Sequence, residues 1–191
     1  RGDAMTGEEI KALAELHTED LPIEDDQALA FINECLFMDL GKDAGVISSE
    51  EITVSGDTWT TMQTSFLDII EIEKNGNTYY GRKYGESRDG FFDIKSKNIR
   101  FPEAGTYTLW GHITPTALTD LGEEPEVHEL LHYPIAIYVA ARAIFWDDEE
   151  NPSFELKMRD YYTYKQNVLN QLADMEPTTK KSRKVRIPPF A

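Results

Sequence analysis

The apolar residues of this chain change their period twice, and this change constrains the fold more than any other feature. They recur at helical spacing from Thr6 to about Leu40, alternate with polar residues from Ser48 to Thr114, and return to helical spacing from Glu126 to Met175. Alternation favours strands, and a period of 3.6 favours helices. The 191 residues suffice for one domain with a substantial core. We therefore predict an α+β fold, a helical bundle with a small antiparallel β-sheet inserted between its halves.

The first half of the bundle should contain two helices. The Thr-Gly-Glu-Glu sequence that begins at Thr6 is a capping-box pattern, and the helix that follows should end near His17. A second helix should begin near Asp25. It should end at Gly41, because glycine commonly terminates helices.

The second half should contain two helices that form an antiparallel hairpin across a loop of about five residues. Pro125 suits a first helical position, so the penultimate helix should begin near Glu126. Pro134 then either kinks this helix or marks its true start. Asn151 and Pro152 read as the N-cap and the first residue of the last helix.

The inserted sheet should have about five strands. They are expected around residues 52–54 and at residues 66–73, 91–94, 98–101 and 106–113. Asn75-Gly76 is a strong hairpin signal, because this pair supplies the positive φ angles of a type I′ turn. We expect one domain over residues 6–175, with residues 6–47 and 120–175 helical and residues 48–114 forming the β insertion.

Residues 176–191 have no periodicity and should form a flexible basic arm. A basic terminus could bind nucleic acid, lipid or an acidic protein, could add a strand to a partner's sheet, or could simply be mobile. We favour a docking arm, because Ile187, Pro188, Pro189 and Phe190 are too apolar for a tail that serves only solubility. The docking residues are expected to be Lys180, Lys181, Arg183, Lys184, Val185, Arg186, Ile187 and Phe190.

The net charge of −16 is unevenly distributed. The last 14 residues hold five bases and no acid, so the remaining chain has 14 bases against 35 acids. We therefore expect the acidic part of the chain to repel nucleic acid. The acidic excess either serves solubility alone or forms a surface past which DNA slides without binding. The single cysteine, Cys35, lies on an apolar helical face and should be a buried thiol in a reducing compartment. The longest apolar run is shorter than a membrane span and no signal peptide is evident, while Met5 suits a natural start.

The HELLH sequence at residues 128–132 raises the possibility of a zinc peptidase. HExxH on a helix places two imidazoles one turn apart, so His128 and His132 would bind Zn²⁺ and Glu129 would act as general base. A third ligand is needed, and Glu149, Glu150 or Glu155 could supply it. Pro134 counts against this hypothesis because it bends the helix beside a ligand. We favour a coincidental helix start, with no metal and no cofactor.

Other candidate sites are weaker. His17 and His112 have no neighbouring catalytic partner in the sequence, and no phosphate-binding glycine loop is present. The acidic run at residues 147–150 could bind Ca²⁺ or Mg²⁺, but it lacks the ligand spacing of an EF-hand loop. A solvated loop is the favoured interpretation of this run.

The order of elements resembles the head-to-tail connector proteins (adaptor or head-completion proteins) of tailed bacteriophages. The resemblance covers residues 6–175. It is carried by a joint in which a strand ends at Pro115 and at the pair Leu118-Thr119. An acidic-Pro segment, Glu124-Pro125, then leads to a helix start that bears His128. An alanine-rich helix and a tyrosine-rich helix follow.

This resemblance implies a structural, non-enzymatic virion protein. Such proteins form a ring under the portal, extend the DNA channel without binding DNA specifically, and receive the tail or neck proteins. Their C-terminal segment commonly docks on the portal, which suits the basic arm. The implied location is the virion neck, and the host cytoplasm during assembly. The role of residues 57–90, as a channel loop or a tail contact, stays open.

Two other functions remain open from the sequence. The first is the small zinc metallopeptidase that uses HELLH. The second is an acidic decoy or inhibitor of a DNA-binding protein, which would compete with DNA and would need no ring.

Overall fold

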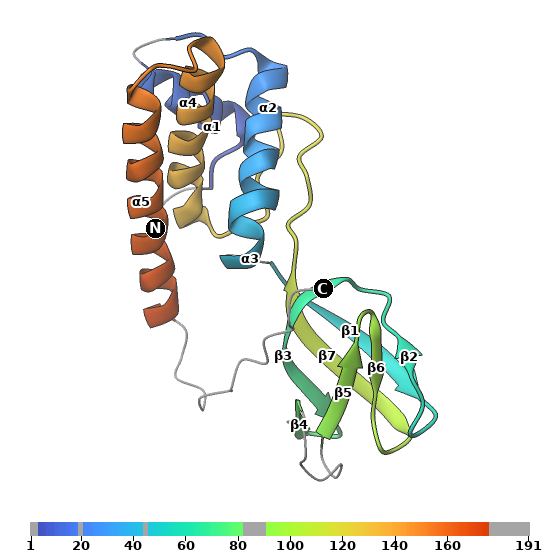
Figure 1. Cartoon of the computed structure of the whole chain (residues 1–191). Helices are drawn as coiled ribbons and strands as arrows, with labels where there is room; N and C mark the ends of the chain where they lie inside the picture. The colour runs from blue at the N-terminus through green and yellow to red at the C-terminus, as the bar shows by residue number, and fades with distance from the viewer. Residues whose placement is uncertain (1–3, 19–20, 44–45, 82–90, 176–191) are drawn as a thin grey trace. The chain divides into compact units, whose positions relative to one another are not determined.

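The computed structural model of the chain describes residues 4–18, 21–43, 46–81 and 91–175 (Figure 1). These residues form two compact units. The helical unit comprises residues 4–46 and 114–175, and the strand unit comprises residues 47–113. The predicted α+β organisation is confirmed, and both junctions lie within one residue of the expected limits of the β insertion. Each unit has its own hydrophobic core, so the segment that we expected to be one domain is built around two cores.

The helical unit contains the predicted helices together with three short helical segments. In chain order its elements are α1 (Gly7–His17), α2 (Asp25–Glu34), η1 (Cys35–Leu40), α3 (Gly41–Asp43), η2 (Glu129–Leu131), α4 (His132–Asp147) and α5 (Ser153–Met175). α4 contacts α1, α2 and α5, which explains why it is apolar on nearly all sides (Figure 1).

The predicted capping box at the start of α1 is present. The backbone N–H of Glu9 donates to Oγ1 of Thr6 at 3.3 Å, and the backbone N–H of Thr6 donates to Oε2 of Glu9 at 2.9 Å. These two bonds satisfy donors that a helix start otherwise leaves unpaired. The helix ends at His17, as predicted.

The prediction that Gly41 ends the second helix is wrong. After α2 the chain widens into the π-helical turn η1, and Gly41 continues in right-handed helical geometry with φ −55° as the first residue of α3. A Cβ atom at Gly41 would lie 3.2 Å from the carbonyl oxygen of Leu36. Glycine therefore permits the close approach of the wide turn, where a larger residue would crowd it.

The predicted start of the penultimate helix at Glu126 is also wrong. α4 begins at His132 after the single 3₁₀ turn η2, and Pro125 lies before both in an irregular segment. Pro134 therefore falls in the first turn of α4, where its missing N–H has no helical partner to lose. Of the two alternatives for Pro134, the structure selects the helix start.

The last two helices form the predicted hairpin. α4 packs against α5, and residues 148–152 connect them, which matches the expected loop length. Asn151 lies just before α5, and its Oδ1 caps the helix by accepting a hydrogen bond from the N–H of Ser153 at 2.9 Å.

The described residues between 46 and 113 form seven strands, two more than expected. The strands are β1 (Val46–Val54), β2 (Thr60–Thr61), β3 (Phe66–Lys74), β4 (Asn77–Gly81), β5 (Phe91–Lys95), β6 (Asn98–Arg100) and β7 (Gly105–Ile113). Their order in the sheet is β1-β7-β3-β4-β5-β6-β2. Sequence patterning missed β2 because two residues are too few to show a period.

The sheet is mainly antiparallel, as predicted, but it contains one parallel pair of strands. β3 pairs antiparallel with β4 and with β7, and β6 pairs antiparallel with β5 and with β2, but β4 and β5 are parallel neighbours. The β3–β4 turn has the predicted geometry, with φ 52° at Asn75 and φ 78° at Gly76. A compact apolar cluster, which includes Ile72, Ile99 and Tyr107, forms the core of this unit.

Candidate functional site

The HELLH segment does not form a continuous helix. His128 has extended backbone geometry and caps η2, because its Nδ1 accepts a hydrogen bond from the N–H of Leu130 at 3.2 Å. His132 lies beyond that 3₁₀ turn as the first residue of α4. The zinc hypothesis requires both imidazoles on one face of one helix, and the structure does not have this arrangement. The physical reason is that the ring of His128 caps the first turn of η2, so His128 lies before this 3₁₀ turn and outside α4.

Both ring nitrogens of His132 are engaged inside the helical unit. The N–H of Met5 donates to Nδ1 at 2.9 Å, and Nε2 lies 3.3 Å from the carbonyl oxygen of Val127. Nδ1 must be unprotonated to accept, so Nε2 carries the proton and donates to Val127. The side chain is only 1% exposed, and burial lowers the pKa of His132 below its ordinary value. This neutral imidazole joins the N-terminal segment to the start of α4.

The glutamates considered as a third zinc ligand lie at the wrong end of the hairpin. α4 has 16 residues, so about 24 Å of helix separates His132 from the loop that carries Glu149 and Glu150. Glu155 lies in the first turn of α5, beside the same loop. Within the residues that the structure describes, no group of three or more His, Cys, Asp or Glu side chains is arranged to hold a metal ion. The geometry favours the interpretation of HELLH as a helix entry.

The joint that carries the family resemblance is a fixed segment of the helical unit. The side-chain amide of Asn33 on α2 accepts from the N–H of Leu118 at 2.8 Å and donates to the carbonyl oxygen of Leu118 at 3.0 Å. Glu123 accepts from the N–H and from the hydroxyl of Thr119, at 2.7 and 2.8 Å. The hydrogen bonds to Thr119 hold the pKa of Glu123 below its ordinary value. These contacts fix residues 118–123 within the helical unit, where the chain has no regular secondary structure.

The backbone at the start of α1 is hydrogen-bonded to the same joint. The N–H groups of Gly7 and Glu8 donate to the carbonyl oxygens of Glu123 and Leu121, at 2.9 and 2.8 Å. A Cβ atom at Gly7 would lie 3.0 Å from the backbone of Leu121, so glycine is what allows this approach. These hydrogen bonds and this close contact hold the N-terminal segment against the joint.

A partly buried polar cluster that the sequence did not reveal anchors η1 and α3 to α5. Nζ of Lys165 lies 3.0 Å from Oδ1 of Asp39 and 2.9 Å from Oδ2 of Asp43, and the side chain of Lys165 is 8% exposed. Burial by itself lowers the pKa of Lys165, but the hydrogen bonds to Asp43 and Asp39 outweigh it and raise the pKa above its ordinary value. In the sequence, this lysine interrupts the stripe of apolar residues along α5. That interruption was the only sequence signal of the cluster.

Cys35 and Tyr161 extend this cluster into the core. Sγ of Cys35 lies 3.5 Å from the hydroxyl oxygen of Tyr161, and both residues are fully buried. Burial raises the pKa of the Cys35 thiol to about 12. The predicted buried core thiol is confirmed, and a thiol in this state is a poor nucleophile.

His112, which has no neighbouring partner in the sequence, has a distant one in the structure. Its Nδ1 lies 2.6 Å from Oδ1 of Asp68, and its backbone N–H donates to the same oxygen at 3.3 Å. The two residues are 44 positions apart and are brought together as a cross-strand pair of β3 and β7. Only the strand register could have revealed this pair.

The acidic run at residues 147–150 lies at the turn between α4 and α5. Its four side chains are exposed, and Oδ1 of Asp148 accepts from the N–H of Glu150 at 3.1 Å. This geometry agrees with the solvated loop that the sequence favoured. The predicted docking residues of the basic arm, from Lys180 to Phe190, lie outside the described residues, as do residues 82–90 of the segment left open above.

Comparisons with models of known protein families and with curated protein sequences found no match. The connector interpretation therefore depends on the joint and the element order alone. Among the described helices, none combines the length and the apolar character needed to cross a membrane.

Proposed function

We propose that this protein is a structural connector of a tailed-bacteriophage virion, which joins the portal to the tail. The observation that carries this proposal is the joint between β7 and α4, where Leu118 is held by Asn33 and His128 caps the helix entry. Leu118 and His128 are also among the residues that carry the resemblance. In a connector, such a joint would fix the start of the α4–α5 hairpin with respect to the N-terminal helices.

The charge distribution supports a protein that surrounds DNA without binding it. Residues 1–177 hold 35 acids against 14 bases, and phosphate groups are repelled by such an excess. The proposed partners are the portal, further copies of this chain in a ring, and tail or neck proteins. The basic residues from Lys180 to Arg186 would dock on the portal.

Native mass spectrometry of the purified full chain, with zinc offered and then removed, tests this proposal directly. We expect a metal-free chain that forms a ring, either alone or when purified portal rings are added. Negative-stain electron microscopy of the portal mixture should then show added density on one face of the portal. One tightly held zinc ion per chain, lost in H132A, would overturn the proposal in favour of the peptidase.

Truncation after Pro177 separates the role of the arm from that of the body. The truncated chain should lose portal binding, because the five bases of residues 178–191 are removed. A matched control is the full chain with K157A, which removes a base from α5 and leaves the arm intact. Unchanged portal binding by the truncated chain would contradict the docking role of the arm.

A further inference from the structure

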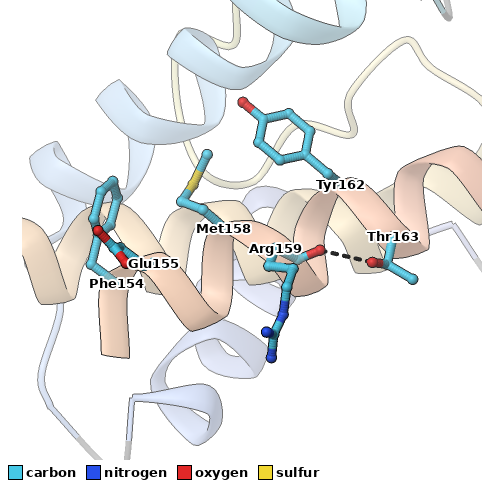
Figure 2. Close-up of a pocket in the computed structure, with 6 residues that line it drawn as sticks. All are labelled: Phe154, Glu155, Met158, Arg159, Tyr162 and Thr163. Atoms are coloured by element: carbon cyan, nitrogen blue, oxygen red, sulfur yellow. Dashed lines mark hydrogen bonds between the residues drawn. The ribbon is translucent and has the colours of Figure 1, made fainter. Parts of the chain in front are cut away.

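A shallow groove on α5 is lined by side chains of that helix alone. The apolar residues Phe154, Met158 and Tyr162 recur every four residues, so they form one row along the helix. Figure 2 shows Met158 and Tyr162 on the same side of α5. Phe154 and Met158 are half-buried, while Tyr162 is 52% exposed. An exposed apolar row on a helix is typical of a surface that packs against another helix.

A row of polar side chains runs beside the apolar row. Glu155, Arg159 and Thr163 each follow a residue of the apolar row by one position, and all three are exposed. Glu155 and Arg159 are one helical turn apart, a spacing that commonly allows an ion pair within a helix. Within the described part of the chain neither forms an ion pair, and Figure 2 shows the guanidinium of Arg159 turned away from Glu155. Both charges are therefore available to a partner.

The groove contains one acid and one base, so it does not favour a partner of a single charge sign. Glu155 would repel a nucleic acid, and Arg159 would repel a basic peptide. A row that carries both signs is instead complementary to a second copy of itself that runs in the opposite direction. Charge complementarity therefore selects another copy of α5 as the occupant of the groove.

Two antiparallel copies of α5, related by a two-fold axis level with Lys157, match both rows at once. Glu155 and Arg159 are equally far from Lys157, so Glu155 of each copy lies level with Arg159 of the other. The two Arg159 residues are then offset by about 6 Å along the helix axis, at 1.5 Å per residue. Phe154 of each copy is offset from Tyr162 of the other by only about 3 Å, which is within reach of two aromatic rings.

The other charged groups near this face do not oppose the pairing. The exposed acidic run 147–150 of one copy would lie near residues 164–167 of the other, which contain no acid. Lys157 and Asp160 both act electrostatically on His17 of α1, so they lie on another side of α5. No like charges are therefore brought together at either end of the groove.

We propose that α5 binds α5 of a second copy in antiparallel orientation. The apolar row of Phe154, Met158 and Tyr162 forms the contact, and two ion pairs between Glu155 and Arg159 fix its direction. The contact is isologous, because both copies use the same surface. A ring is held by head-to-tail contacts between different surfaces, so this pairing is separate from the ring of the proposed function and does not depend on it.

Charge reversal at two positions tests this pairing in the full chain. E155R gives the polar row two bases and R159E gives it two acids, so each variant should repel its own copies. We expect the dimer dissociation constant of each variant to be at least about tenfold higher than that of the parent in sedimentation equilibrium. An equimolar mixture of the two variants should form heterodimers, because every ion pair then joins an acid to a base. Native mass spectrometry identifies the heterodimer by its mass.

The mixture separates a lost contact from a lost fold, since a misfolded variant would not regain association. Q171R is the matched control: Gln171 is exposed and follows Tyr162 by nine positions, which places it on the opposite side of the helix, so Q171R should associate like the parent. A parent chain that stays monomeric at high micromolar concentration would overturn the proposal. Association that persists in E155R or R159E, or a mixture of the two that fails to associate, would equally overturn it.

Discussion

Asn33 binds both backbone groups of Leu118 through the two polar atoms of its side-chain amide. The two residues are 85 positions apart, and the contact fixes the irregular joint against α2. A buried turn without regular structure needs such partners, because its backbone groups otherwise lose their hydrogen bonds to water.

Replacement of Asn33 should therefore destabilise the helical unit. N33A removes one donor and one acceptor and leaves the N–H and carbonyl of Leu118 unpaired, which should lower the free energy of unfolding by about 1–3 kcal/mol. Urea denaturation followed by circular dichroism measures this change. N167A, at an exposed asparagine of α5, is the control and should change stability by less than about 0.5 kcal/mol. Equal stability of the two variants would show that the Asn33 contact contributes nothing.

The stability of the helical unit should fall in mild acid because of His132. Its pKa is lowered by burial in the folded state from an ordinary value of 6.5, so the unfolded chain takes up a proton first as the pH falls. The stabilisation is fully present above pH 6.5 and is lost as the pH falls toward the folded pKa. Denaturation of the parent and of H132Q between pH 7.5 and pH 5.5 checks this, since H132Q should show the weaker pH dependence. H128Q changes the exposed cap residue and should retain the pH dependence of stability of the parent. The same pH dependence in the parent, H132Q and H128Q would refute its assignment to His132.

Removal of the Lys165 ammonium should loosen η1. K165M keeps most of the side-chain volume but leaves Asp39 and Asp43 without their cation. Because the two carboxylates are 25% and 50% exposed, water offsets part of the penalty, and we expect a loss of about 1–3 kcal/mol. Thiol labelling of Cys35, which is buried against Tyr161, should become faster at native pH as η1 opens. K157M, a lysine of the same helix outside this cluster, should leave both stability and labelling unchanged.

Gly111 should not tolerate a larger residue. A Cβ atom there would contact the carbonyl oxygen of Asp68 and the ring of Phe66, across irregular pairing between β3 and β7. G111A should destabilise the strand unit by more than about 2 kcal/mol, because the backbone of β3 must move. T108A on the same strand is the control, and thermal denaturation compares them. Equal melting temperatures of G111A and T108A would show that β3 and β7 accommodate the added methyl group without a loss of stability.

The sequence by itself determined the class and order of the elements. Two changes of hydrophobic period located the helices and the strands, and local chemistry fixed the capping box at Thr6, the type I′ turn at Asn75-Gly76 and the N-cap at Asn151. These features depend on hydrogen bonds and torsion angles within a few residues, which is the range that a sequence pattern reports.

Only the tertiary structure decided the chemistry of the sites. The roles of His132, His112 and Lys165 depend on partners that lie 127, 44 and 126 residues away in the chain. Local signals misplaced the start of α4 and the end of the second helix, because packing against distant segments outweighed the preferences of Pro125 and Gly41. The free energy that selects a ring tautomer, a π-helical turn or a buried ion pair comes from contacts between distant segments, and no short stretch of sequence contains it.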